Sequence, residues 1–356
     1  MNEKRILYYD ILNIAACIAV ITLHHNGLVH TFSETRLWRE CLLAEVCFFW
    51  AVPVFLMLSG ATLMDYRKKY STKTFFKKRL MRVGLPWLFW SIVLLLYKCI
   101  RGTYILEIGD WRAVLDAVVN CKIEPRYWFF PVIIGIYMFM PILSFWADSK
   151  YKKILWYAIS WSIIANGTMP ILIDLFKLPY NTAFESPFSG YYVFVILGYL
   201  LSTTEIKKEV RKLIYCLGIA CAVIRYVGIY YLSMRDGVKN TLLFDYGQFH
   251  SFFLAMAIFV FVKYVKWDHI INPKIQRGIT RLAGCSLGIY LIHIPIMNLE
   301  LKWFNVWEGD FAWRTVFVLV TYIICLAIVW GGKNNSGGEK AVSVKAKEPI
   351  QRKVYT

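Results

Sequence analysis

The sequence predicts an all-α fold, a polytopic membrane bundle of about ten transmembrane helices with both termini in the cytoplasm. The first observation is composition: 58% of the 356 residues are hydrophobic and 18% are charged, more apolar surface than a soluble protein of this length is expected to bury. The second is the recurrence of apolar runs close to the ~20 residues that cross a bilayer. The third is the uneven distribution of lysine and arginine between successive connecting segments.

The expected spans follow one another with short connections. The fifth span is interrupted by Asn166, Gly167 and Pro170, and the sixth is short. Such breaks are tolerated at membrane depth where the freed backbone groups face protein or a wet cavity. The ten spans lie near residues 6–28, 41–64, 83–100, 127–147, 153–173, 187–202, 212–232, 247–266, 284–302 and 311–330.

Basic residues predict the orientation. With the N-terminus in the cytoplasm, inside segments hold 28 of the 41 lysines and arginines and outside segments hold 11, while Lys98 and Arg225 lie within spans. Because positive charge favours the cytoplasmic side, this asymmetry supports both the span count and the orientation. We therefore expect one membrane domain over residues 1–330 and a disordered polar tail over residues 331–356.

The formal net charge of +18 first suggests a nucleic-acid-binding protein. We reject that class because the basic residues are divided among the segments between apolar runs, as in proteins whose loops lie against anionic lipid head groups. The nine cysteines form no CxxC pair and no Cys/His ligand spacing, so we expect no metal.

A polar stripe follows one face of the first expected helix. Asp10, Asn13, Cys17 and His24 fall within an arc of about 60° at 100° per residue. Ionisable residues inside a membrane are costly and usually face a protein-lined cavity. The stripe therefore predicts a polar interior beside this helix.

Histidine is the side chain best suited to general-base chemistry near neutral pH. His24 lies roughly 27 Å along the first helix from Ile6, near its outer end. His25 lies about 100° off the stripe and is the weaker candidate. His293, in the ninth span, is a supporting candidate. For each ring, the alternative is a structural or interfacial histidine.

The second span carries a carboxylate, Glu45, and a pair of small residues, Ser59 and Gly60. Glu45 and Ser59 lie about 40° apart on a helical wheel, so we expect them to share a face. Ser59 and Gly60 permit a close helix approach, and packing alone is the alternative interpretation.

The segment from Arg67 to Arg82 is the most basic part of the chain. We expect a loop that leads into the third span, with Arg79 and Arg82 as helical neighbours at i and i+3. Arginine binds phosphate through a planar pair of donors, so this segment is a candidate clamp for a phosphorylated cytosolic ligand. The alternative is that these basic residues only set the orientation of the chain in the membrane and contact lipid head groups. The basic candidates are Lys77, Lys78, Arg79 and Arg82.

Four further residues complete the candidate site. Arg126 and Trp128 open the fourth span, and Glu185 lies in an outer loop. Arg225 lies in the middle of the seventh span, where an arginine needs a partner or a wet site.

Together these segments resemble the acyltransferase type 3 family, the membrane O-acyltransferases of bacterial surface polysaccharides. Their order along the chain agrees with the family, and the resemblance covers about residues 5–330. Two positions depart from its pattern: Asn13 stands where many members have arginine, and Arg126-Tyr127 precedes Trp128 where a histidine is common. The segments are YDILNIAACIAVITLH at 9–24, VPVFLMLSG at 52–60, FFKKRLMRVGLPW at 75–87, YWFFP with Tyr137 and Pro141-Ile-Leu, and LGIYLIH at 287–293.

The resemblance implies transfer of an acetyl group from cytosolic acetyl-CoA to a hydroxyl of a surface or capsular polysaccharide, or of its lipid-linked precursor. It implies that His24 is the essential histidine and that Arg79 and Arg82 bind CoA, in the bacterial plasma membrane. His24 acts either as a general base or as a transient acyl carrier. The rival hypothesis is a transporter or flippase for a polysaccharide intermediate. The oligomeric state is left open.

Overall fold

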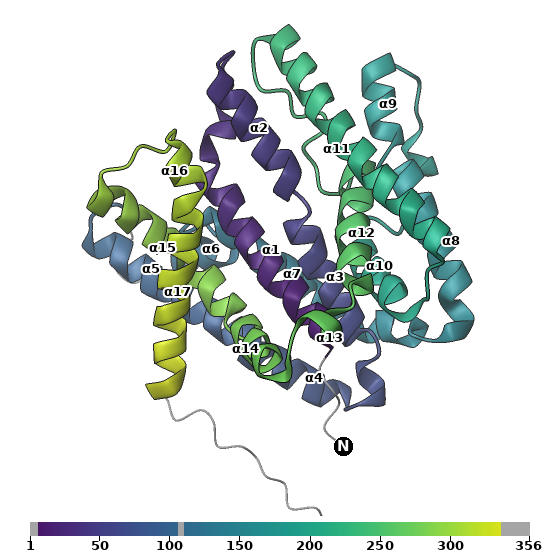
Figure 1. Ribbon diagram of the computed structural model, residues 1–356. Coiled ribbons are helices and arrows are strands. Elements are labelled where there is room, and N and C mark those ends of the chain that lie inside the picture. Colours follow the sequence, from purple (N-terminus) through teal and green to yellow (C-terminus); the bar gives the residue numbers. More distant parts are fainter. Residues whose placement is uncertain (1–5, 106–109, 336–356) are drawn as a thin grey trace, which may run out of the picture.

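The computed structural model describes residues 6–105 and 110–335, and every regular element in those two ranges is a helix (Figure 1). The α-helices are α1 (Leu7–His25), α2 (Arg36–Phe48), α3 (Ala51–Leu63), α4 (Thr72–Arg79), α5 (Leu85–Ile100), α6 (Trp111–Val119), α7 (Phe129–Leu143), α8 (Lys152–Ala165), α9 (Met169–Phe176), α10 (Tyr192–Thr203), α11 (Lys208–Asp236), α12 (Phe249–Tyr264), α13 (Trp267–Ile270), α14 (Pro273–Ala283), α15 (Ser286–Phe304), α16 (Phe311–Arg314) and α17 (Val316–Asn335).

Within the two described ranges, six helical stretches are long and apolar enough to cross a membrane, or seven if α14 and α15, bent by 58°, form one span. Three further expected spans coincide with apolar helical segments of only 10–17 residues, Tyr192–Thr203 in α10, Phe249–Tyr264 in α12 and Val316–Gly332 in α17. The all-helical membrane fold is confirmed, whereas the count of ten and the sides of the termini stay predictions. Helix α17 continues to Asn335, past the expected start of the tail; residues 336–356 lie outside the described ranges.

Helix α1 lies at the centre of the bundle (Figure 1). It packs against α2, α3, α12, α14, α15, α16 and α17. Its contacts with α14 and α15 follow in the same chain order along α1, since Asp10 pairs with Thr280 on α14 and His24 pairs with His293 on α15. The polar stripe of α1 thus faces protein, as predicted.

Helices α3 and α10 approach each other at backbone distance because both carry glycine at the crossing. A Cβ atom on Gly60 would lie 1.8 Å from the Val195 carbonyl oxygen, and one on Gly198 would lie 2.0 Å from the Met57 carbonyl oxygen. The small residue that the sequence suggested at position 60 is therefore required for packing.

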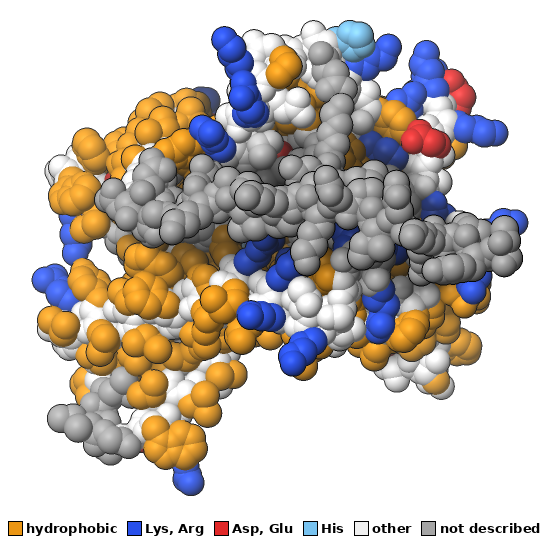
Figure 2. All heavy atoms as spheres, turned by 90° about the horizontal axis from the view of Figure 1, so that it is seen from below, with side chains coloured by type: hydrophobic (Ala, Val, Ile, Leu, Met, Phe, Trp, Pro, Cys, Tyr) orange, Lys and Arg blue, Asp and Glu red, His pale blue; other side chains and the backbone are white. Residues whose placement is uncertain are grey.

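The outer surface of the bundle carries many exposed large apolar side chains, as expected for a lipid-facing surface. Examples are Phe89 and Ile92 on α5, Ile219 on α11 and Ile323 on α17. Figure 2 shows the end of the bundle at which α4 and α14 lie. Lysine and arginine side chains gather across the middle of this end, and apolar side chains spread along its margins.

Two local expectations are wrong. The segment from Arg67 to Arg82 is not a loop: α4 begins at Thr72, capped by Ser71, and a π-helical turn over Leu80–Gly84 joins it to α5. The second span is found as one apolar stretch over Arg36–Lys68, but the regular helix expected between Glu45 and Ser59 has a break where α2 ends at Phe48 and α3 begins at Ala51. Single-sequence periodicity does not reveal either irregular turn.

Candidate active site

The polar stripe of α1 contacts one continuous seam on α14 and α15. The Thr280 hydroxyl donates to Asp10 Oδ2 at 2.8 Å, and the Cys17 sulfur lies 3.9 Å from the Ser286 carbonyl oxygen. Further along, His24 Nδ1 lies 2.6 Å from His293 Nε2. The structure therefore joins two histidines that the sequence placed 269 residues apart.

The hydrogen bonds of His293 determine the tautomers of both rings when both are neutral. His293 Nδ1 lies 2.7 Å from the Tyr290 carbonyl oxygen, which can only accept, so Nδ1 carries the proton. His293 Nε2 then accepts from His24 Nδ1–H. This leaves His24 Nε2 with its lone pair, the form that a general base or a nucleophile requires. His293 is fully buried.

His25 belongs to a different network. Its Nε2 lies 2.9 Å from the Thr321 hydroxyl oxygen, and that hydroxyl donates to Glu300 Oε2 at 2.5 Å. All three side chains are buried, and the His25 ring also packs on Trp313. His25 is thus directed toward α15–α17, on another side of α1 from the His24–His293 pair.

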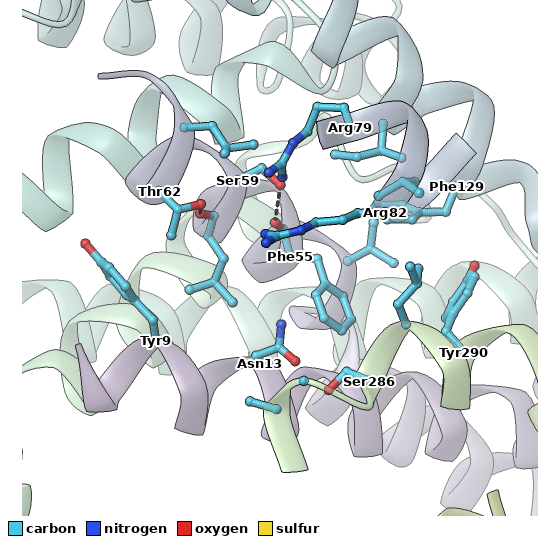
Figure 3. A pocket seen from close by; sticks show the side chains of 18 of the residues that line it. Tyr9, Asn13, Phe55, Ser59, Thr62, Arg79, Arg82, Phe129, Ser286 and Tyr290 are labelled. Carbon is cyan, nitrogen blue, oxygen red and sulfur yellow. Dashed lines mark hydrogen bonds between the residues drawn. The ribbon is translucent and has the colours of Figure 1, made fainter. Parts of the chain in front are cut away.

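A cavity of about 670 Å³ lies beside the same seam (Figure 3). Apolar side chains such as Phe55, Leu58 and Ile133 form much of its wall. Its size and its few polar groups are typical of a small-molecule site. The polar lining residues are Tyr9, Asp10, Asn13, Ser59, Thr62, Arg79, Arg82, Tyr137, Ser286 and Tyr290.

Both predicted arginines line the cavity. Arg79 ends α4 and Arg82 lies in the π-helical turn, and Figure 3 shows both side chains reaching into the cavity near Ser59. The Arg79 guanidinium also lies 5.7 Å from the centre of the Tyr137 ring. Two convergent guanidinium groups are suited to an anionic ligand such as a phosphate.

The two predicted lysines lie outside the cavity lining. Lys77 and Lys78 are exposed on α4. The Lys78 ammonium lies 4.0 Å from the centre of the Tyr70 ring. The structure therefore separates the basic cluster into two cavity arginines and two surface lysines.

Tyr290 connects the cavity to the histidine pair. It lines the cavity, its ring centre lies 5.4 Å from that of His293, and its hydroxyl donates to the Arg126 carbonyl oxygen at 2.6 Å. On α1 the cavity reaches Val20, about 6 Å of helical rise from His24. His24 does not itself line the cavity, so the cavity ends about one helical turn short of it.

Arg225 has the partner that its position requires. It is fully buried, its Nη2 lies 3.9 Å from Glu45 Oε1, and it donates to the carbonyl oxygens of Leu243 and Glu45. Its guanidinium also lies 3.5 Å from the centre of the Phe49 ring. Glu45 is therefore tied to α11, while Ser59 lines the cavity, and the expected shared face is not used.

The fourth-span candidates lie at the His24 end of the bundle. The Arg126 side chain is 51% exposed and pairs with Glu124 at 3.2 Å. The Trp128 ring stacks on Tyr246 with centres 6.0 Å apart.

Beyond the end of α1, Lys239 donates a hydrogen bond to His30 Nδ1 at 2.7 Å. Burial lowers the pKa of His30, and the charge of Lys239 adds to that effect. Glu185 is exposed after a short 3-10 turn.

Sequence reasoning missed Ser286 and Tyr290. Both lie on the face of α15 that carries His293, at spacings of four and three residues. That spacing is a helical stripe like the one on α1 and was available in the sequence.

Within residues 6–105 and 110–335, no group of three or more His, Cys, Asp or Glu side chains is arranged to hold a metal ion.

Comparison with known proteins identifies the family of the chain. A family model described as an acyltransferase domain matches residues 6–330. No curated protein and no solved structure gives a significant match. The matched region contains the cavity, both arginines and both histidines of the pair. The chain therefore belongs to the acyltransferase type 3 family, a family of membrane acyltransferases, and is a multi-pass membrane protein.

Proposed function

We propose that the protein is an O-acetyltransferase of the bacterial plasma membrane. It moves an acetyl group from cytosolic acetyl-CoA to a hydroxyl of a surface polysaccharide or of its lipid-linked precursor. Arg79 and Arg82 bind CoA phosphates at the basic end of the cavity. The pantetheine arm occupies the apolar cavity, and the thioester reaches His24 past Tyr290.

The chemistry uses the free nitrogen of His24. Nε2 removes the proton from the acceptor hydroxyl as its oxygen attacks the thioester carbonyl. The carbon–sulfur bond breaks, the acetyl group remains on the acceptor oxygen, and the departing CoA thiolate recovers the proton from His24. In the other route, Nε2 attacks the carbonyl itself and CoA leaves as the thiolate; the acetyl group then passes from Nε2 to the acceptor oxygen, and the thiolate takes up the proton of that hydroxyl. Both routes need the same unprotonated Nε2.

The observation that carries this proposal is the hydrogen-bonded order Tyr290 carbonyl, His293, His24. It supports a His24 ring that is held in place with a free Nε2. General-base catalysis typically contributes 10²–10⁴-fold, so positioning of the donor and acceptor supplies much of the remaining rate.

The test replaces His24 by alanine in the native host. The expected result is a surface glycan of normal length that has lost its acetyl groups in mass spectra, with the variant still present in the membrane. His269→Ala, at an exposed position on α13, is the matched histidine control and should leave acetylation unchanged.

Two results would contradict the proposal. Full acetylation in the His24→Ala strain would remove His24 from the chemistry. Loss of the polymer itself after deletion of the gene would favour the transporter hypothesis.

The donor is tested separately by CoA binding to the purified protein. Charge-assisted hydrogen bonds are worth about 1.5–3 kcal/mol each. Replacing Arg79 and Arg82 by glutamine should therefore weaken CoA binding at least about tenfold, and the difference should shrink at high salt because exposed charges are screened. Unchanged affinity would leave these arginines a topogenic role.

A further inference from the structure

Three buried polar atoms of the cavity-lining residues have no hydrogen-bond partner in the described part of the chain. They are Asn13 Oδ1, Arg79 Nε and Ser286 Oγ. A buried polar group without a partner costs roughly 1–3 kcal/mol, so proteins seldom leave one unpaired. The described residues contain thirteen such atoms, and three of them belong to residues that line this one cavity, where a bound ligand can supply a partner. Arg79 belongs to the phosphate end, whereas the other two need a separate explanation.

Asn13 and Ser286 lie on neighbouring helices, across the cavity from the arginines (Figure 3). Ser286 is only 5% exposed and is the first residue of α15, directly after the 58° bend. The first backbone N–H groups of α15 have no partner within the helix and form its positive end. The Asn13 side chain points toward the cavity in Figure 3, and its amide offers one acceptor and two donors.

This set of groups is complementary to an amide. The Ser286 hydroxyl can donate to an amide oxygen, and Asn13 Oδ1 can accept from an amide N–H. A phosphate has oxygens that only accept, so it would leave Asn13 Oδ1 unpaired. A hydrocarbon chain would leave both atoms unpaired. The apolar wall around them, including Val20, Phe55 and Leu287, is suited to the methylene groups on either side of an amide.

We propose that Asn13 and Ser286 form a clamp for an amide of the pantetheine arm of the acyl donor. The proposal rests on the acyl-CoA function above and goes further by naming the residues that recognise the arm. The arm carries two amides between its phosphate and its sulfur. Ser286 and His293 are seven residues apart on α15, about 10 Å of helical rise. An arm held at the clamp therefore has its thioester end directed toward the histidine pair.

The experiment measures two ligands on the purified full chain in detergent or nanodiscs. CoA contains the arm, and adenosine bisphosphate is its head group without the arm. The variants are Asn13→Leu, Ser286→Ala and the double variant. Thr62→Val is the matched control, because Thr62 also lines the cavity but its hydroxyl already donates to the Leu58 carbonyl oxygen at 2.7 Å.

The double variant should lower CoA affinity by about 5- to 100-fold, which corresponds to two neutral hydrogen bonds. It should leave the affinity for adenosine bisphosphate unchanged, and the effect should not depend on salt because the clamp is uncharged. Arg79→Gln should instead weaken both ligands. Ser286→Ala removes no hydrogen bond of its side chain seen in the structure, so its melting temperature should stay at or above that of the wild type.

Two outcomes would overturn the clamp while leaving the proposed function intact. In one, the double variant binds CoA as tightly as Thr62→Val does. In the other, its affinities for CoA and adenosine bisphosphate fall by the same factor, which would mean that the two residues contact phosphate. Absence of CoA binding by the wild type would instead overturn the proposed function itself, and the clamp with it.

Discussion

Replacing His293 should reduce turnover and leave donor binding unchanged. In His293→Leu, His24 Nδ1–H loses the acceptor that lies 2.6 Å away, and the ring is free to adopt the other tautomer. An unsatisfied buried donor costs roughly 1–3 kcal/mol, which corresponds to a loss of about 5- to 150-fold in kcat. KM for acetyl-CoA should change little because neither histidine lines the cavity.

His293→Gln is the matched variant. Its side-chain oxygen can take the place of Nε2 as acceptor, so the hydrogen bond is kept and kcat should stay within about tenfold of the wild type. The assay follows labelled acetyl transfer by the purified protein to alkali-deacetylated surface polysaccharide of the native host, over a range of donor concentrations. Equal kcat values for the leucine and glutamine variants would refute the tautomer argument. A rise in KM at constant kcat would show that His293 binds the donor instead.

Two predictions concern stability in detergent. Gly60→Ala forces a methyl group to within 1.8 Å of the Val195 carbonyl oxygen, so it should lower the unfolding free energy by about 1–3 kcal/mol. The control Gly278→Ala, whose methyl group would meet nothing within 4 Å, should leave the unfolding free energy unchanged. Equal melting temperatures for the two variants would contradict the close crossing of α3 and α10. Arg225→Met leaves Glu45 without its buried partner and should cost about 3–5 kcal/mol, while adding Glu45→Gln should restore part of that loss. Failure of the double variant to recover would show that the two side chains are not coupled.

The first helix shows how far the sequence alone could lead. The spacing of Asp10, Asn13 and His24 predicted a face buried against protein, and the structure confirms it because helical periodicity is a local property. The partner of that face was not predictable in the same way. His293 lies 269 residues from His24, and only packing brings them together.

The errors have a local cause. A helical wheel assumes regular geometry, which the break between Phe48 and Ala51 interrupts; Glu45 pairs with Arg225, whereas Ser59 lines the cavity. The π-helical turn at Leu80–Gly84 likewise turned an expected loop into continuous helix. Irregular turns of this kind arise from tertiary packing and leave little signal in composition. They are also common at functional sites, and here one of them carries Arg82.

The separation between the cavity and the histidine pair is determined by the packing of α1 against α14 and α15 and not by a loop. Three contacts join α1 to the α14–α15 segment. Asp10 meets a residue 270 positions later in the chain, and Cys17 and His24 each meet a residue 269 positions later. A nearly constant offset over 14 residues means that the α14–α15 segment, despite its 58° bend, follows α1 in the same chain direction over about 21 Å of α1. In the proposed function, a donor bound by its phosphates at Arg79 and Arg82 would therefore meet Asn13 and then His24 at fixed distances along one seam. A donor whose arm is shorter than this seam could bind the arginines but could not bring its thioester to His24.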